Sequence, residues 1–162
     1  MIGNTRIHDA SWNPAISEAF KLIGPSLSAR LAHVQWVVGV DPLFAGVHHY
    51  STTTDGRAYG DTAHVAYALH IPGPADRRAT SVILPKRASG SWGDVAVVVH
   101  ELGHALHEAV GFDHDALPVS RYARTNRWEA FAEAFTSWVW GPGYADRPSP
   151  QSVAFFRNLE RS

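Results

Sequence analysis

The longest helical pattern in this chain is SWGDVAVVVHELGHALHEAVG, residues 91–111. Its apolar residues predict a helix that begins near Ser91 and extends to about Val110. Ser91 and Asp94 have the form of a capping box, and Gly111 suits the position that follows a helix. Residues 95–99 are all aliphatic, so we expect the first half of this helix to be buried.

The same stretch contains an H-E-x-x-H motif, formed by His100, Glu101 and His104. Two histidines four residues apart lie on one face of a helix, so both imidazoles can reach one zinc ion. Glu101 points away from the line joining them and can still take a proton from a zinc-bound water. The motif predicts His100 and His104 as zinc ligands and Glu101 as the general base.

A catalytic zinc needs a third protein ligand, which the motif does not supply. The extended pattern with a third histidine fails, because His107 occupies its glycine position and Val110 its last histidine position. Glu129 and Glu133 are better candidates, since they lie four residues apart on one face of a predicted helix. We assign Glu129 as the ligand and Glu133 as the acceptor of an N–H from a ligand imidazole; the exchanged assignment is the alternative.

Composition narrows the possible chemistry. The 162 residues include ten histidines and no cysteine, which excludes disulfides, thiolate zinc fingers and a cysteine nucleophile. A net charge of −1 gives no basic field for nucleic acid or an anionic membrane, so we expect neither as a partner. No signal peptide or membrane-spanning run is evident, so a soluble cytoplasmic protein is expected, with release by a non-classical route as the alternative.

The sequence as a whole predicts one domain, residues 1–162, of the α+β class. Further helices are expected over residues 11–23, where Gly24-Pro25 ends the helix, around 27–33, over 126–140 and from Ser149 onward. Strands are expected over residues 34–38, 63–71 and 80–84. Pro85 follows the last of these and favours an edge strand beside the H-E-x-x-H helix. Such an edge can pair with an extended substrate.

Residues 122–135, YARTNRWEAFAEAF, resemble the corresponding segment of the catalytic domain of anthrax lethal factor. The Pro-Pro endopeptidases share related features, and both groups are gluzincins, zinc peptidases with an H-E-x-x-H helix and a later glutamate ligand. The resemblance covers about residues 80–159. It implies a compact zincin-like metallopeptidase domain with Zn²⁺ as cofactor and Glu129 as the third ligand. It also implies that Tyr122, seven residues before Glu129, assists catalysis by stabilising the oxyanion.

Four further histidines are not expected to take part in the chemistry of the site. His107 is expected to be a neighbour in the cleft or a core histidine. His114 lies between Asp113 and Asp115 and mimics a ligand cluster, but it follows the end of the helix. His48 and His49 are expected to belong to a loop.

These features together predict a zinc-dependent metalloendopeptidase that acts on protein or peptide substrates. One alternative is a regulatory zinc peptidase that cleaves a repressor inside the cell. The other is a non-catalytic module in which zinc stabilises an assembly or binding protein. Glu101 argues against the second alternative, since a purely structural zinc site needs no general base.

Overall fold

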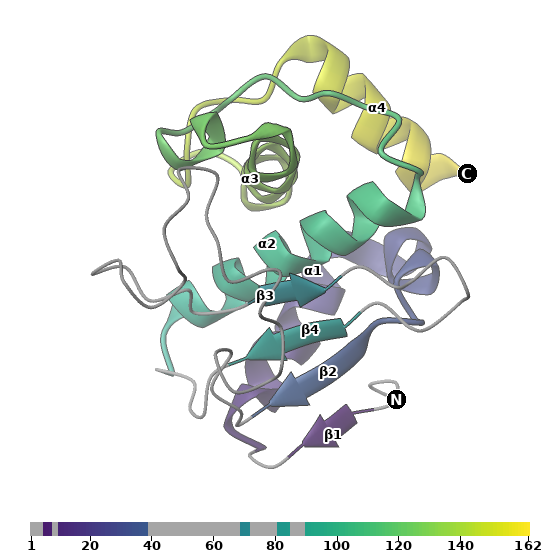
Figure 1. Cartoon of the computed structure of the whole chain (residues 1–162), viewed down its shortest axis with the longest axis vertical. Coiled ribbons are helices and arrows are strands. Elements are labelled where there is room, and N and C mark those ends of the chain that lie inside the picture. The colour runs from purple at the N-terminus through teal and green to yellow at the C-terminus, as the bar shows by residue number, and fades with distance from the viewer. Residues whose placement is uncertain (1–4, 8–9, 39–68, 72–80, 85–89) are drawn as a thin grey trace.

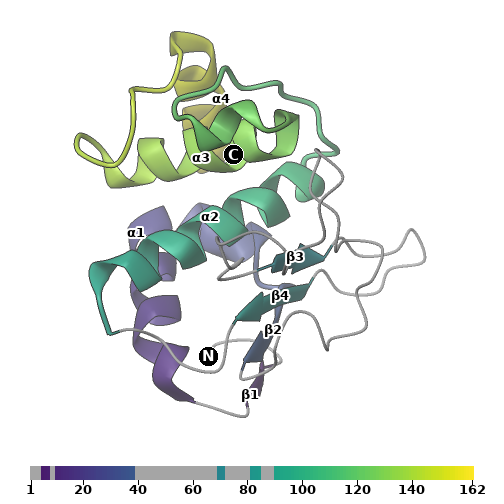
Figure 2. The ribbon, with the colours of Figure 1, turned by 60° about the vertical axis from the view of Figure 1, so that its left-hand side comes forward.

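We describe the fold from a computed structural model of the chain, in which residues 5–7, 10–38, 69–71, 81–84 and 90–162 are described. The helices are α1 (Asn13–Arg30), α2 (Trp92–Ala109), α3 (Arg127–Trp140) and α4 (Pro150–Arg161), with short 3-10 turns at η1 (Ala10–Trp12) and η4 (Tyr122–Arg124). The strands are β1 (Thr5–Ile7), β2 (Gln35–Val38), β3 (Leu69–Ile71) and β4 (Ser81–Leu84). Helix α2 lies at the centre, with α3 and α4 on one side and the sheet and α1 on the other (Figures 1 and 2).

Helix α1 is divided by a kink. Gly24 (φ 80°, ψ 171°) is non-helical and separates two helical segments, so the prediction that the first helix ends at Gly24-Pro25 is confirmed. The second segment ends at Arg30, whereas the separate helical piece was expected around residues 27–33. Glycine tolerates this positive φ, and Pro25 suits the start of the new helical segment because its missing N–H is not needed there. Ile16, Ile23 and Leu27 are buried along the helix, which fixes it against the core on both sides of the kink.

The strands form a small sheet in the order β1-β2-β4-β3. β1 pairs with β2 and β2 with β4 in parallel, while β3 pairs with β4 antiparallel. Residues 80–84 were expected to form an edge strand, and this is wrong, since β4 has a hydrogen-bonded neighbour on each side. The edge nearer α2 is β3 (Figure 1).

The predicted fold class also needs correction. The described residues are mostly helical, whereas each strand has only three or four residues. An α+β domain organised around a sheet is therefore the wrong class, and the fold is mainly helical. The buried side chains explain the difference: Trp36, Val82 and Leu84 of the strands join a core that helices α1, α2 and α3 largely supply. Of the strand predicted over 63–71, only Leu69–Ile71 lies among the described residues.

Helix α2 begins and ends within one residue of the predicted positions, but the predicted capping role of Ser91 is not seen. The Ser91 side chain makes no capping hydrogen bond, and Asp94 Oδ2 instead accepts one from the Gly90 N–H at 2.6 Å. At the other end Gly111 has a φ of 71°. Its N–H donates to Glu108 O at 2.9 Å, and the Phe112 N–H donates to His107 O at 2.8 Å. These two bonds form a Schellman motif, which satisfies the last carbonyls of the helix.

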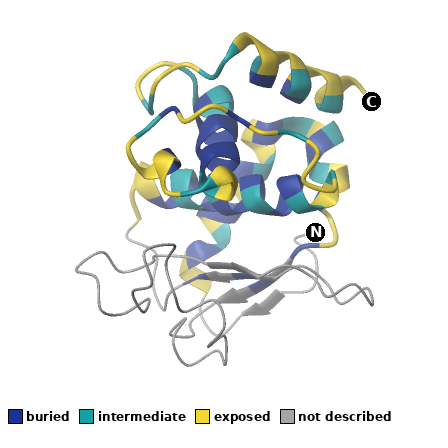
Figure 3. Ribbon diagram, turned by 45° about the horizontal axis from the view of Figure 1, so that its top comes forward, coloured by how far each residue is buried: buried dark blue, intermediate teal, exposed yellow. Residues whose placement is uncertain are grey.

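Helices α3 and α4 begin within one residue of their predicted starts, and a side chain caps each of them. Asn126 Oδ1 accepts the N–H of Glu129 at 2.9 Å, and Ser149 Oγ accepts the N–H of Ser152 at 3.2 Å. The buried residues of α4, Ser152 and Phe156, lie on the side that faces the other helices (Figure 3). Within the described residues, no helix combines the length and apolar character needed to cross a membrane.

Candidate metal centre

Helices α2 and α3 approach each other closely at Gly103, inside the H-E-x-x-H motif. A Cβ placed on Gly103 would stand 3.0 Å from Ala132 Cα and 3.2 Å from the Phe135 ring, so only glycine fits without displacement. Because Gly103 follows His100 by three residues, the close approach occurs on the face that carries both motif histidines. The second helix is thereby brought within reach of His100 and His104.

The structure brings His100, His104 and Glu129 together. Three atoms, Nε2 of His100, Nε2 of His104 and Oε2 of Glu129, form a triangle. Its sides measure 3.0 Å from His100 to Glu129, 3.1 Å from His100 to His104 and 3.4 Å from His104 to Glu129. Among the described residues, these three form a group that could hold a metal ion. All three side chains are 12% exposed, so one side of the group is open to solvent.

The triangle has the size that a tetrahedral zinc site requires. With zinc–ligand distances of about 2.0–2.1 Å, neighbouring ligand atoms of a tetrahedron lie about 3.3 Å apart. The three measured separations are close to this value. Two imidazole nitrogens and one carboxylate oxygen, with a fourth position left open, are also a donor set that zinc accepts at catalytic sites. The residues present therefore fit the ion.

Glu133 lies behind the triangle and binds the other nitrogen of His100. Its Oε1 is 2.9 Å from Nδ1 of His100. A carboxylate can only accept, so Nδ1 carries the hydrogen, and in the neutral ring Nε2 then presents a lone pair toward Glu129. Two lone pairs facing each other at 3.0 Å repel unless a cation, either a proton or a metal ion, lies between them. Glu133 thus contacts a candidate ligand without belonging to the triangle, which is the position that the sequence predicted for it.

The charges around the triangle favour a cation. Burial opposes protonation of His100, but hydrogen bonds to Glu129 and Glu133 and the charge of Glu101 outweigh it and raise the pKa of His100 to about 10. Burial likewise opposes ionisation of Glu129, yet its hydrogen bonds to His100 and His104 hold the pKa of that carboxyl well below its usual range. Three carboxylates around two imidazoles thus leave an excess of negative charge, most of which a dication would offset.

The two predicted catalytic residues lie beside the triangle. Glu101 is 6% exposed and close enough for its charge to act on His100. The Tyr122 ring, on η4, is 5.9 Å from the His100 ring between centroids, and this side chain is half exposed. Tyr122 is thus on the solvent side of the site. The catalytic roles of both residues remain predictions.

The sequence argument missed three residues of this site. Ser120 Oγ donates to Glu133 Oε2 at 2.7 Å, and the Tyr144 hydroxyl donates to Glu133 Oε1 at 2.7 Å. Neither has a helical spacing to Glu133 or a known motif, so the sequence contained no signal for them. Gly103 did have a signal, because a glycine in a helix interior weakens the helix and suggests close packing.

Two further histidines among the described residues, His107 and His114, have structural contacts. His107 is fully buried, stacks on Phe131 at 4.0 Å and donates from Nε2 to the carbonyl of His114 at 3.1 Å. It is therefore a core histidine. His114 stacks on Phe155 at 4.4 Å, and its Nε2 lies 3.0 Å from Ser152 Oγ. His48 and His49 lie outside the described residues.

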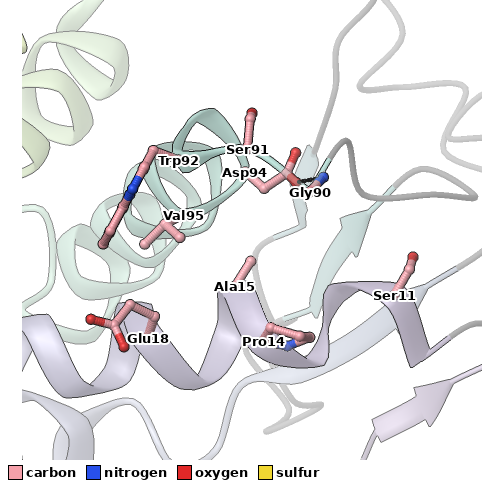
Figure 4. Close-up of a pocket in the computed structure, with 9 residues that line it drawn as sticks. All are labelled: Ser11, Pro14, Ala15, Glu18, Gly90, Ser91, Trp92, Asp94 and Val95. Carbon is pink, nitrogen blue, oxygen red and sulfur yellow. Dashed lines mark hydrogen bonds between the residues drawn. The ribbon is translucent and has the colours of Figure 1, made fainter.

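A surface pocket of about 510 Å³ lies where the N-terminal parts of α1 and α2 meet (Figure 4). Glu18 of α1 and Trp92 and Asp94 of α2 are among its lining residues. It shares no lining residue with the triangle, and we assign it no part in the chemistry of the metal centre.

Comparisons of the chain with models of protein families, with curated proteins and with solved structures find no match. The relationship to the gluzincins therefore remains a prediction that depends on the motif residues themselves.

Proposed function

We propose that this chain is a zinc-dependent metalloendopeptidase. The observation that supports this most is the triangle of His100, His104 and Glu129, whose dimensions match three corners of a zinc tetrahedron. A structural zinc site is closed by four protein ligands, whereas the group found among the described residues has three. An open fourth position beside a buried glutamate is the arrangement that hydrolysis needs.

Zinc bound here would polarise the scissile carbonyl and lower the pKa of a water molecule. Glu101 takes a proton from the attacking water and later donates it to the leaving amine. The Tyr122 hydroxyl donates a hydrogen bond to the oxyanion that develops on the carbonyl. Glu133 accepts the Nδ1–H of His100 and so keeps the ring in the tautomer whose Nε2 is a ligand.

The test compares the wild-type chain with Glu101→Ala and Glu129→Ala for zinc content and for cleavage of a peptide library. Glu101→Ala is expected to retain zinc and lose cleavage, because the base is not a ligand. Glu129→Ala is expected to lose zinc affinity and, with it, cleavage. Glu108→Ala, a change outside the triangle on the same helix α2, is the control.

A wild-type chain that binds no zinc, or a Glu101→Ala variant that cleaves normally, would contradict the proposal. The same variants separate the peptidase from a non-catalytic zinc module. In such a module Glu101→Ala has no functional phenotype, and the wild type cleaves no peptide of the library although it binds zinc.

A further inference from the structure

We propose that Tyr144 and Ser120 are positioning residues of the zinc site. Both hold the Glu133 carboxylate: Tyr144 fixes it toward the imidazole of His100, and Ser120 connects it to the segment that carries Tyr122. The inference rests on the proposed zinc binding at His100, His104 and Glu129, and it extends that function to two residues that no motif identifies. Both act from outside the triangle, through hydrogen bonds to a single buried carboxylate.

Glu133 accepts three hydrogen bonds from three separate parts of the chain. His100 Nδ1 on α2 and the Tyr144 hydroxyl, in the segment that follows α3, both donate to Oε1, at 2.9 and 2.7 Å. Ser120, in the segment before η4, donates to Oε2 at 2.7 Å. Glu133 is 6% exposed, so these donors take the place of water around its charge.

The Tyr144 hydroxyl fixes the direction of Oε1. Burial and the negative charge of Glu133 raise the pKa of Tyr144, so its hydroxyl keeps its hydrogen and remains a donor. With both Tyr144 and His100 donating, the two lone pairs of Oε1 are occupied. Glu133 is thereby kept from rotating toward the triangle, where it would compete with Glu129 for the metal ion. The Tyr144 contact thus helps to decide which glutamate is the ligand.

Ser120 connects Glu133 to the segment that carries Tyr122. Its Oγ accepts the N–H of Ala123 at 3.0 Å, so its one hydrogen is available for Glu133. Ala123 is the residue after Tyr122, and the Tyr122 ring lies beside His100. Ser120 therefore fixes the start of η4 relative to the carboxylate that orients His100. Loss of this hydroxyl should disturb Tyr122 more than the metal ligands.

The chain offers a matched control for Tyr144. Ser137 Oγ on α3 donates to the carbonyl of Asp146 at 2.7 Å, and this bond secures the same segment without contact to Glu133. Ser137→Ala removes a hydroxyl of α3 and Tyr144→Phe removes a hydroxyl of the segment that follows it, and each change removes a 2.7 Å hydrogen bond between that segment and α3. A difference in metal binding between them then reports on Glu133 and not on the segment as a whole.

The experiment measures the Zn²⁺ affinity of the full chain by competition with a chromophoric chelator, and the visible absorption spectrum of the Co²⁺-substituted chain. Tyr144→Phe is expected to weaken Zn²⁺ binding about 3- to 10-fold and to change the Co²⁺ spectrum. This loss of affinity is smaller than the 10- to 100-fold loss that is typical when a residue bonded directly to a metal ligand is changed. Ser137→Ala should stay within about twofold of wild type. In a Glu133→Gln background, Tyr144→Phe should have little further effect. Ser120→Ala should lower kcat at saturating zinc with little change in Zn²⁺ affinity.

Three results separate the possible failures. If the wild type binds zinc and Tyr144→Phe matches Ser137→Ala in both affinity and spectrum, the role of Tyr144 is wrong while the proposed function stands. If Ser120→Ala retains the wild-type kcat, the role of Ser120 is wrong. A wild-type chain without zinc affinity overturns the proposed function and this inference with it.

Discussion

Gly103 of α2 lies directly against the backbone of Ala132 in α3, and an added Cβ would be only 3.0 Å from Ala132 Cα and 3.3 Å from its carbonyl oxygen. Both atoms belong to a helix backbone, so neither can move aside alone. The contact sets the distance between the helix that carries His100 and His104 and the helix that carries Glu129. The geometry of the metal centre thus depends on a residue that has no ligand atom.

Gly103→Ala should therefore weaken both the fold and the site. We expect a loss of about 1–3 kcal/mol in the free energy of unfolding, from overpacking, although alanine is the better helix former. Zinc affinity should fall, since α3 must move away from α2.

Gly93→Ala is the matched control, because it lies in the same helix and its added Cβ meets only the Ser91 hydroxyl, at 3.2 Å. Chemical denaturation and zinc titration of both variants test this. An unaltered zinc affinity in Gly103→Ala would show that the contact does not set the ligand geometry.

Glu129→Gln and Glu133→Gln should separate the two glutamates of α3. Glu129 faces Nε2 of both histidines, whereas Glu133 faces His100 from its Nδ1 side. We expect Glu133→Gln to lower zinc affinity about 10- to 100-fold and Glu129→Gln to lower it further. Equilibrium zinc titration measures both. The opposite order of affinities would mean that the two roles are exchanged.

The sequence predicted the site residues better than the fold because the two depend on different kinds of information. Helical periodicity places His100, His104, Glu129 and Glu133 on defined faces, and these faces meet in the structure. The separation of the two helices depends on packing at Gly103, which spacing alone does not define. The partners Ser120 and Tyr144 come from irregular segments, where no periodicity links them to Glu133.

The predicted edge position of the strand over residues 80–84 was wrong for a related reason, although the strand itself is present. A short run of apolar and β-branched residues such as 80–84 predicts a strand but not its neighbours, and Pro85 favoured an edge. In the structure β2 and β3 pair with both sides of β4. Pairing between strands far apart in sequence depends on the path of the chain between them, and local composition contains little information on that path.

Tyr122→Phe should slow catalysis without loss of metal. The Tyr122 side chain is half exposed and stands beside His100, so its hydroxyl can meet the substrate while contributing little to the core. Loss of an oxyanion donor typically lowers kcat about 10²- to 10³-fold. We expect that decrease with wild-type zinc content and an unchanged melting temperature. Steady-state kinetics on a cleaved peptide, with metal analysis of the same sample, checks both. A wild-type kcat would remove Tyr122 from the mechanism.

His107 should make the fold sensitive to acid. Burial and the nearby charge of Arg127 lower the pKa of His107 to about 4, from an ordinary value of 6.5. The unfolded chain therefore takes up the proton first as pH falls, so the contribution of His107 to stability is complete above pH 6.5 and is lost between pH 6.5 and about 4. A shift of this size corresponds to about 3 kcal/mol in the free energy of unfolding.

The measurement is urea unfolding from pH 4.5 to 7.5 with a chelator present, so that metal binding, itself dependent on pH, does not contribute. His107→Phe is the comparison, because a phenyl ring preserves the stacking on Phe131 but cannot titrate. This variant loses the hydrogen bond to the His114 carbonyl at every pH, which lowers its stability by a constant amount. The wild type should therefore lose stability more steeply than His107→Phe as the pH falls. Parallel curves for the two proteins would mean that the buried imidazole accepts a proton in the folded state without cost.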